Sequence, residues 1–197
     1  MDANSALLIV DLQNDFCPGG ALPVPEGDRV VAPLNRAAEL FAAAKLPIVA
    51  SRDWHPAVTS HFSAYGGIWP AHCVQGSRGA EFHPCLELPQ GHYLISKGVE
   101  TDADSYSAFD GRLADGRSLQ ELLAGLGVMK LYVGGLATDY CVRESVLAAI
   151  RAGLRVVVLE DAIAGVDVTT GDSLRAIEEM KAAGASFCSV SALAGGI

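Results

Sequence analysis

KLYVGGLATDYCVRESVLAAIRA, residues 130–152, is a strand, a tight turn and a helix in immediate succession. The apolar run Lys130–Gly134 predicts a buried strand, and the glycine-rich turn that follows leads into a helix over Thr138–Ala152. The apolar stripe of that helix has helical spacing. Its members are Val142, Val146, Ala149 and Ile150. A strand that passes directly into a helix indicates an α/β fold.

The same alternation continues on both sides of this stretch. Further strands are expected at Ala6–Val10, Pro47–Ser51, Tyr93–Ser96, Arg155–Leu159 and Ser186–Val190, and further helices at Val30–Ala44, Ser118–Leu126 and Thr170–Ala183. The long irregular stretch Asp53–Gly91 predicts a functional loop, because structureless chain of that length is uncommon inside a compact domain. We therefore expect a single doubly wound, three-layer α/β/α domain spanning residues 1–197, with a six-stranded, mainly parallel sheet.

Composition narrows the class of protein. The chain has 197 residues, half of them hydrophobic, and a formal net charge of −9 without a basic patch, which argues against nucleic acid as a partner. Its five cysteines are irregularly spaced and form no CxxC pair, so a reducing compartment fits better than a disulfide framework. The apolar run Leu7–Val10 is too short for a signal peptide or a membrane span. The sequence therefore predicts a cytoplasmic protein that binds neither nucleic acid nor a membrane.

Three reactive residue types follow predicted strands. Asp11 follows the first strand, Lys97 the third, and Cys141 lies in the first turn of the helix after the fourth. In open α/β sheets ligands bind outside the carboxyl ends of the strands, where the strand order reverses. We therefore expect the three side chains to converge there.

Cys141 is the sharpest candidate for a nucleophile. The positive end of the helix dipole and the ammonium of Lys97 are expected to lower its pKa, and Thr138 or Asp139 to cap the helix. Exposed backbone N–H groups there can hold an oxyanion. Each residue also has a plainer interpretation: Cys141 as a small buried hydrophobic residue, Asp11 as a loop or helix cap, and Lys97 as a solvated surface cation.

A second group is suited to a metal ion. Asp53 and His55 are two residues apart at a strand end, so their side chains share one face, and His61 and His72 can approach from the long loop. One carboxylate with two or three imidazoles suits Zn²⁺, Fe²⁺ or Mn²⁺. The alternative is a set of loop histidines that are satisfied by hydrogen bonds alone.

Several segments together resemble one family. They are VDLQNDFCPGG at 10–20, SRDWHP at 51–56, HFS at 61–63, WPAHC at 69–73, Lys97-Gly98, DSYSAF at 104–109 and GLATDYCVR at 135–143. In this order they resemble the nicotinamidase/pyrazinamidase branch of the isochorismatase-like hydrolases. The resemblance implies a cysteine amidohydrolase that converts nicotinamide to nicotinate and ammonia through a thioester, also deamidates pyrazinamide, and serves NAD salvage.

The resemblance also implies roles for particular residues. It implies a catalytic triad of Asp11, Lys97 and Cys141, a cis peptide at Leu136–Ala137, and an oxyanion hole formed by the N–H groups of Ala137 and Cys141. It implies one divalent metal ion, Zn²⁺ or alternatively Fe²⁺ or Mn²⁺, on Asp53, His55 and His72, with His61 as a further ligand. Phe16, Trp69 and Tyr106 would form aromatic walls around a pyridine ring.

Two other functions are weighed against this one. A related amidase acting on ureido or carbamoyl substrates is disfavoured by the metal set and by Trp69-Pro70. A metal-binding scaffold with a dead site is disfavoured by the intact Asp11, Lys97 and Cys141. The small-molecule substrate would be nicotinamide, and the sequence leaves open whether the protein forms a homo-oligomer.

Overall fold

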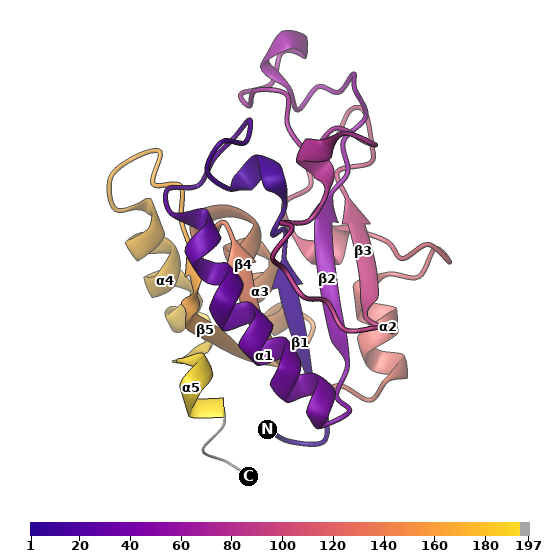
Figure 1. The fold of residues 1–197 in the computed structure, drawn as a ribbon, viewed down its shortest axis with the longest axis vertical. Coiled ribbons are helices and arrows are strands. Elements are labelled where there is room, and N and C mark those ends of the chain that lie inside the picture. Colours follow the sequence, from indigo (N-terminus) through magenta and orange to yellow (C-terminus); the bar gives the residue numbers. More distant parts are fainter. Residues whose placement is uncertain (194–197) are drawn as a thin grey trace.

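A parallel sheet forms the centre of the molecule in the computed structural model, which describes residues 1–193 (Figure 1). Its strand order is β3-β2-β1-β4-β5-β6, and every neighbouring pair is parallel. The strands are β1 Ser5–Val10, β2 Ile48–Asp53, β3 Tyr93–Lys97, β4 Lys130–Leu136, β5 Arg155–Ala164 and β6 Ser186–Cys188. The predicted six-stranded α/β architecture is confirmed, with a sheet that is parallel throughout its described strands.

The strand order reverses beside β1. From β1 the chain builds outward through β2 and β3, then returns to place β4 on the other side of β1. Val10, at the end of β1, pairs with Gly135 near the end of β4. The carboxyl ends of β1 and β4 therefore lie side by side at the point where ligands bind in doubly wound sheets.

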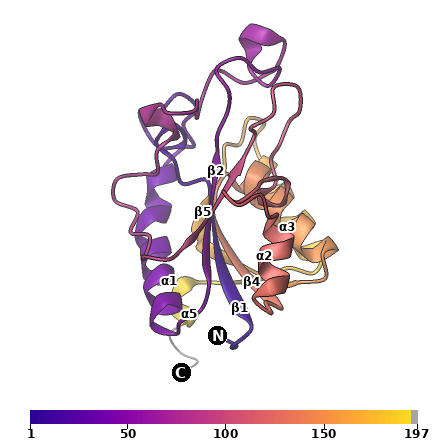
Figure 2. The same cartoon turned by 90° about the vertical axis from the view of Figure 1, so that its right-hand side faces the viewer.

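Helices cover both faces of the sheet (Figure 2). Helix α1 (Val31–Ala43) and the short α5 (Val190–Leu193) lie on one face, with α2 (Leu119–Gly125), α3 (Arg143–Arg151) and α4 (Asp172–Ala182) on the other. In β1, Leu7 and Ile9 join the core beneath α1, whereas Leu8 and Val10 join the core beneath α2 and α3. This two-sided burial explains why β1 is apolar at successive positions rather than alternating.

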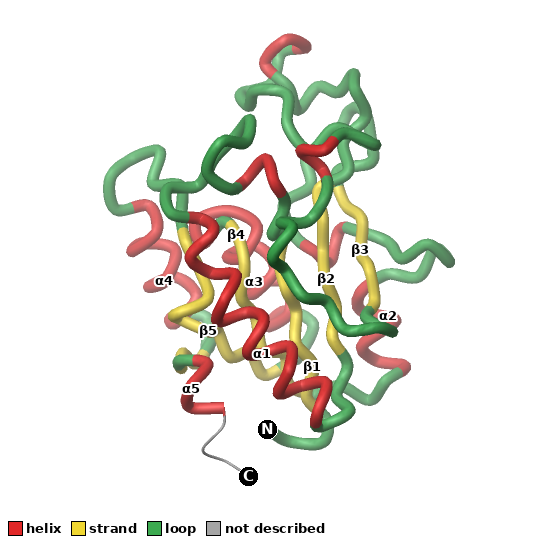
Figure 3. Tube along the Cα trace, viewed as in Figure 1, coloured by secondary structure: helices red, strands yellow, loops and turns green. Residues whose placement is uncertain are grey.

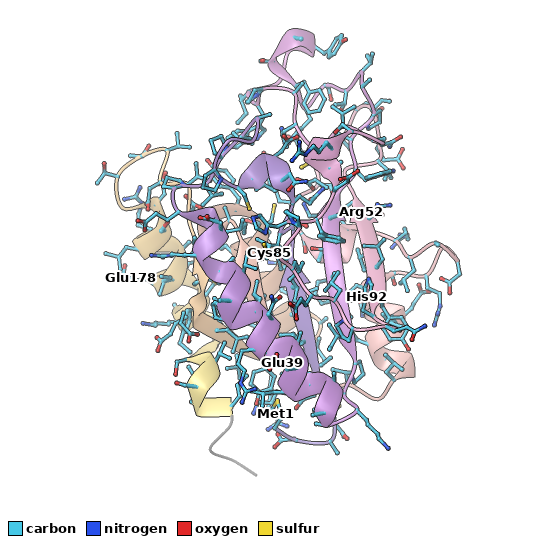
Figure 4. The ribbon with its side chains drawn as sticks, viewed as in Figure 1. Met1, Glu39, Arg52, Cys85, His92 and Glu178 are labelled. Atoms are coloured by element: carbon cyan, nitrogen blue, oxygen red, sulfur yellow. The ribbon has the colours of Figure 1, made fainter. Side chains whose placement is uncertain are left out.

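Side chains on the outer sides of the helices reach solvent. Glu39 on α1 and Glu178 on α4 are exposed and project away from the sheet (Figure 4). Pro33 lies in the first turn of α1, where its missing N–H removes no hydrogen bond within the helix.

The predicted C-terminal end of the strand Ser186–Val190 is wrong. Strand β6 stops at Cys188, and Val190 begins α5. The carboxylate of Asp161 accepts the backbone N–H of Val190 at 2.9 and 3.1 Å. The N–H of Val190 is thus bound by a side chain rather than by a neighbouring strand.

Most of the long stretch between β2 and β3 is loop, as expected (Figure 3). It contains the short 3₁₀ turns Ser63–Tyr65 and Arg78–Ala80. Part of it extends beyond the carboxyl end of the sheet, opposite the N-terminus, and part returns across α1, where Asn35 donates to the carbonyl of Cys85 at 2.8 Å (Figures 1 and 4). No helix among the described residues is long and apolar enough to cross a membrane.

Candidate active site

Asp11, Lys97 and Cys141 meet at the carboxyl edge of the sheet. Asp11 directly follows β1, Lys97 is the last residue of β3, and Cys141 lies in a turn of π-helix, Thr138–Val142, between β4 and α3. The ammonium Nζ of Lys97 is 2.9 Å from Oδ2 of Asp11 and donates to Sγ of Cys141 at 3.4 Å. The three side chains are almost completely buried. The structure thus brings together the three residues that the sequence places at strand ends.

Asp53 belongs to the same buried group. Lys97 also donates to its Oδ1, so the ammonium lies among two carboxylates and a thiol. Burial favours the neutral lysine, yet Asp11 and Asp53 hold the pKa of Lys97 well above its usual range. Burial favours a neutral Asp53 too, but the Lys97 ammonium and the His55 ring hold the pKa of this carboxyl well below its usual range. Lys97 and Asp53 are therefore an ion pair inside the protein.

Asp11 holds its proton more tightly than Asp53. Burial raises the pKa of the Asp11 carboxyl, and the Asp53 charge adds to this, although Lys97 opposes both effects. The hydroxyl of Ser51 donates to Oδ1 of Asp11 at 2.7 Å and stabilises the ionised form. Two carboxylates with opposite pKa shifts around one ammonium suit a site in which Asp11 exchanges a proton.

Two predictions about Cys141 are wrong, one on the pKa of its thiol and one on the cap of its helix. Burial raises the pKa of its thiol well above the usual value, and the ammonium of Lys97 only partly opposes this, so the pKa is not lowered. Neither Thr138 nor Asp139 caps the helix: Ala137 is the N-cap residue, and no side chain hydrogen-bonds there. The carboxylate of Asp139 instead accepts the N–H groups of Val166 and Asp167.

Three histidines gather beside Asp53. Ring nitrogens of His55, His61 and His72 lie within 4.8 Å of one another. Oδ2 of Asp53 is 3.7 Å from Nε2 of His55 and 4.0 Å from Nε2 of His72. Asp53 is the last residue of β2 and His55 follows two positions later, which places both side chains on the same side, as the spacing predicts.

The orientation of the histidines fits a divalent metal ion. Nδ1 of His72 donates to the carbonyl of Pro70 at 2.7 Å, and Nδ1 of His61 faces Oδ1 of Asp104 at 2.5 Å, which leaves their Nε2 atoms available. Nε2 of His55 is buried with no hydrogen-bond partner among the described residues. Burial lowers the pKa of His72 to about 4 and keeps the ring neutral, as ligation requires. A cation would satisfy the buried nitrogen that the protein leaves without a partner.

Gly98 is needed where the chain passes the histidines. Its φ is +67°, and a Cβ atom there would lie 2.5 Å from Cε1 of His55. Only glycine allows this approach without displacing the imidazole. The Lys97-Gly98 pair thus places the ammonium beside Cys141 and lets the next residue of the backbone pass close to the His55 ring.

A cavity lies beside Cys141 and the histidines. The three aromatic residues expected from the sequence, Phe16, Trp69 and Tyr106, line it. Nε1 of Trp69 donates to the hydroxyl of Tyr106 at 2.9 Å, which joins the long loop to the segment after Lys97. The lining also includes four residues that the sequence did not single out: Leu22, Ser105, Tyr140 and Val166. Tyr140 could have been found from its place beside Cys141, whereas nothing in the sequence points to Val166.

Ala137 lines the same cavity as Cys141. The peptide bond between Leu136 and Ala137 is cis, which confirms the conformation implied by the resemblance. Ala137 and Cys141 are both nearly buried, at 8 % and 6 % exposure. Both residues therefore border the cavity while remaining largely shielded from solvent.

Comparisons with known proteins agree over nearly the whole chain. A model of the isochorismatase domain family matches residues 5–192. The chain is 42% identical over 198 residues to a nicotinamidase of Escherichia coli (strain K12). The aligned region covers 92% of this chain and 93% of that relative.

Two solved structures have the same fold. The pyrazinamidase of Pyrococcus horikoshii in complex with zinc is 44% identical, with a TM-score of 0.87 over 94% of this chain and 99% of that one. PnC1 from L. infantum in complex with nicotinate is 37% identical, with a TM-score of 0.84 over 96% of this chain and 94% of that one. The similarity therefore extends well beyond the motifs around Asp11, Lys97 and Cys141.

Proposed function

Since the chain belongs to the isochorismatase family, in its nicotinamidase and pyrazinamidase branch, we propose that it is an amidohydrolase that converts nicotinamide to nicotinate and ammonia in NAD salvage. One observation carries the proposal: Cys141, His61 and His72 line one cavity with aromatic walls. Lys97 is hydrogen-bonded to Cys141 and paired with Asp11, and His55 lies beside the other two histidines. We also propose that the whole chain is a single domain, because the family model extends over residues 5–192.

The proposed reaction uses Cys141 as the nucleophile. Asp11 takes the thiol proton, Sγ attacks the carboxamide carbon, and Lys97 stabilises the developing negative charge. The N–H groups of Ala137 and Cys141 hold the tetrahedral oxyanion. Asp11 then gives its proton to the amide nitrogen and the C–N bond breaks. Ammonia departs, and the acyl group remains bound to Cys141 as a thioester.

Water completes the reaction. Asp11, now ionised, takes a proton from a water molecule, whose oxygen attacks the thioester carbon. The C–S bond breaks, the thiol recovers its proton, and nicotinate leaves. The raised pKa of Asp11 supports this role, since a base that must accept and return a proton works best with a pKa close to the working pH.

We propose that His55, His61, His72 and Asp53 hold one Zn²⁺ ion, with Fe²⁺ or Mn²⁺ as alternatives. When bound, the ion would supply a Lewis-acid position that orients the pyridine nitrogen and so directs the carboxamide toward Cys141. Phe16, Trp69 and Tyr106 would enclose the ring. The buried Nε2 of His55, which has no hydrogen-bond partner within residues 1–193, supports the metal assignment independently of any relative.

Ammonia release tests the proposal. The purified protein, with its metal content measured, is assayed with nicotinamide, with pyrazinamide and with a carbamoyl amide such as N-carbamoylsarcosine. We expect release from the two aromatic carboxamides and far less from the third. A metal-loaded protein that releases no ammonia from either aromatic amide would overturn the proposed function, and preference for the carbamoyl substrate would favour the related amidase.

A further inference from the structure

Asp139 is a buried carboxylate that the proposed reaction does not use. It is 3 % exposed and lies two positions before Cys141 in the π-helical turn. Its Oδ1 accepts the N–H of Val166 at 2.9 Å, and its Oδ2 accepts the N–H of Asp167 at 2.7 Å. Both side-chain oxygens of Asp139 are therefore held by backbone donors of one segment.

The segment that Asp139 holds follows β5 directly. It leaves the carboxyl end of the sheet and leads into α4, at the upper left of Figure 1. The far side of this segment is held as well, because the carboxylate of Asp167 accepts the N–H of Ser173 at 2.8 Å. At Gly165 a Cβ atom would lie 1.8 Å from Oγ of Ser173 and 3.2 Å from Oδ1 of Asp139. The segment is thus confined between the turn that carries Cys141 and the start of α4.

Val166 connects this contact to the cavity. Its N–H is bound by Asp139, while the residue itself lines the cavity together with Cys141, Tyr140 and Trp69. The position of Val166 relative to Cys141 is therefore set by a carboxylate from the same turn as Cys141. We propose that Asp139 is a positioning residue that holds Val166 as a wall of the cavity and thereby determines how tightly the ring of an aromatic carboxamide is bound. This inference rests on the proposed function.

The test is a double-mutant cycle with Asp139→Asn and Val166→Ala. Asparagine has nearly the same shape as aspartate, but its amide nitrogen cannot accept one of the two N–H bonds. Each single variant should raise KM for nicotinamide about tenfold, with kcat within about threefold of wild type, because ring binding rather than the chemical step is weakened. If Asp139 acts through Val166, the double variant should be no worse than the more impaired single variant.

The matched control is Asp161→Asn. Asp161 is also a carboxylate that accepts a backbone N–H, from Val190, and it does not line the cavity. Its variant should leave both kinetic constants unchanged. Hydrogen exchange provides a readout that needs no substrate: Asp139→Asn should accelerate exchange at the amides of Val166 and Asp167, whereas Asp161→Asn should do so only around Val190.

Three results would overturn the inference. Effects on KM that multiply in the double variant would show that Asp139 does not act through Val166. Wild-type exchange rates at Val166 and Asp167 in Asp139→Asn would show that the carboxylate does not hold the segment. If Asp139→Asn does not fold, the Val166→Ala variant decides: an unchanged KM for nicotinamide would show that Val166 does not help to bind the ring. If the wild-type protein is active and any of these results is found, only this inference fails. If the wild-type protein is inactive, the proposed function fails as well.

Discussion

Removal of the Ser51 hydroxyl should shift the pH dependence of the enzyme upward. Oγ of Ser51 donates to Oδ1 of Asp11 at 2.7 Å, and both side chains are completely buried. This bond stabilises the ionised carboxylate, so the Ser51→Ala change should raise the already raised pKa of Asp11 further. A hydrogen bond to a charged group contributes about 1.5–3 kcal/mol, which corresponds to about one to two pKa units.

The assay is the pH profile of kcat/KM for nicotinamide. Asp11 must be ionised to accept the thiol proton, so activity falls as the pH drops through its pKa in the free enzyme. Ser51→Ala should therefore move the acidic limb of the profile about one to two units toward higher pH, with a smaller change on the plateau.

Ser5→Ala is the matched control for this prediction. Ser5 is also completely buried on a strand of the sheet, but its hydroxyl has no hydrogen-bond partner among the described residues. The same substitution there should leave the acidic limb in place. An unshifted limb in folded Ser51→Ala, or a shift toward lower pH, would refute the assignment of Asp11 as the base.

Three further predictions concern the nucleophile, the metal group and acid stability. Cys141→Ala should retain less than about a thousandth of wild-type kcat in the ammonia assay while keeping the wild-type metal content, because only the attacking atom is lost. Gly98→Ala should weaken metal binding at least about tenfold in a competition titration with a chelator, since its Cβ would lie 2.5 Å from the His55 ring, whereas Gly116→Ala, with positive φ but open space, should bind metal normally. In metal-free protein the pKa of His72 is lowered from 6.5 to about 4, so its contribution to stability is present above pH 6.5 and is lost as the pH falls toward 4. The free energy of unfolding should drop by about 3 kcal/mol over that window, and His72→Asn should flatten the slope; an equal slope in the variant would contradict this origin.

The convergence of Asp11, Lys97 and Cys141 is predictable from the sequence because these residues lie at or just after the carboxyl ends of strands. Asp11 directly follows β1 and Lys97 ends β3, and parallel strands bring their carboxyl ends to one edge of the sheet. The i, i+2 spacing of Asp53 and His55 likewise fixed their common side from local geometry alone. These inferences needed only strand direction and side-chain alternation, which neighbouring residues determine.

The features that were missed depend on long-range packing. The pKa of the Cys141 thiol is raised by burial among segments distant in sequence, an effect larger than the lowering by the Lys97 ammonium. The sequence predicts Asp139 as a possible helix cap, but its oxygens accept the N–H groups of Val166 and Asp167, almost thirty residues further along the chain. The sequence predicts Val190 as the end of a strand, but its N–H is bound by the side chain of Asp161 on β5. No local pattern encodes any of these contacts.

The two oxygens of Asp53 face different neighbours, one the ammonium of Lys97 and the other the imidazoles of His55 and His72. A single negative charge is thus shared between the histidine group and the Asp11 and Cys141 side of the site. Protonation of Asp11 or Cys141, beside Lys97, can change the affinity of the histidine group for a cation. By thermodynamic reciprocity, cation binding must then change the proton affinity of those groups by the same factor. Metal uptake by this protein should therefore be accompanied by proton release from residues that never touch the metal, and a mutation on either side should alter the titration of the other.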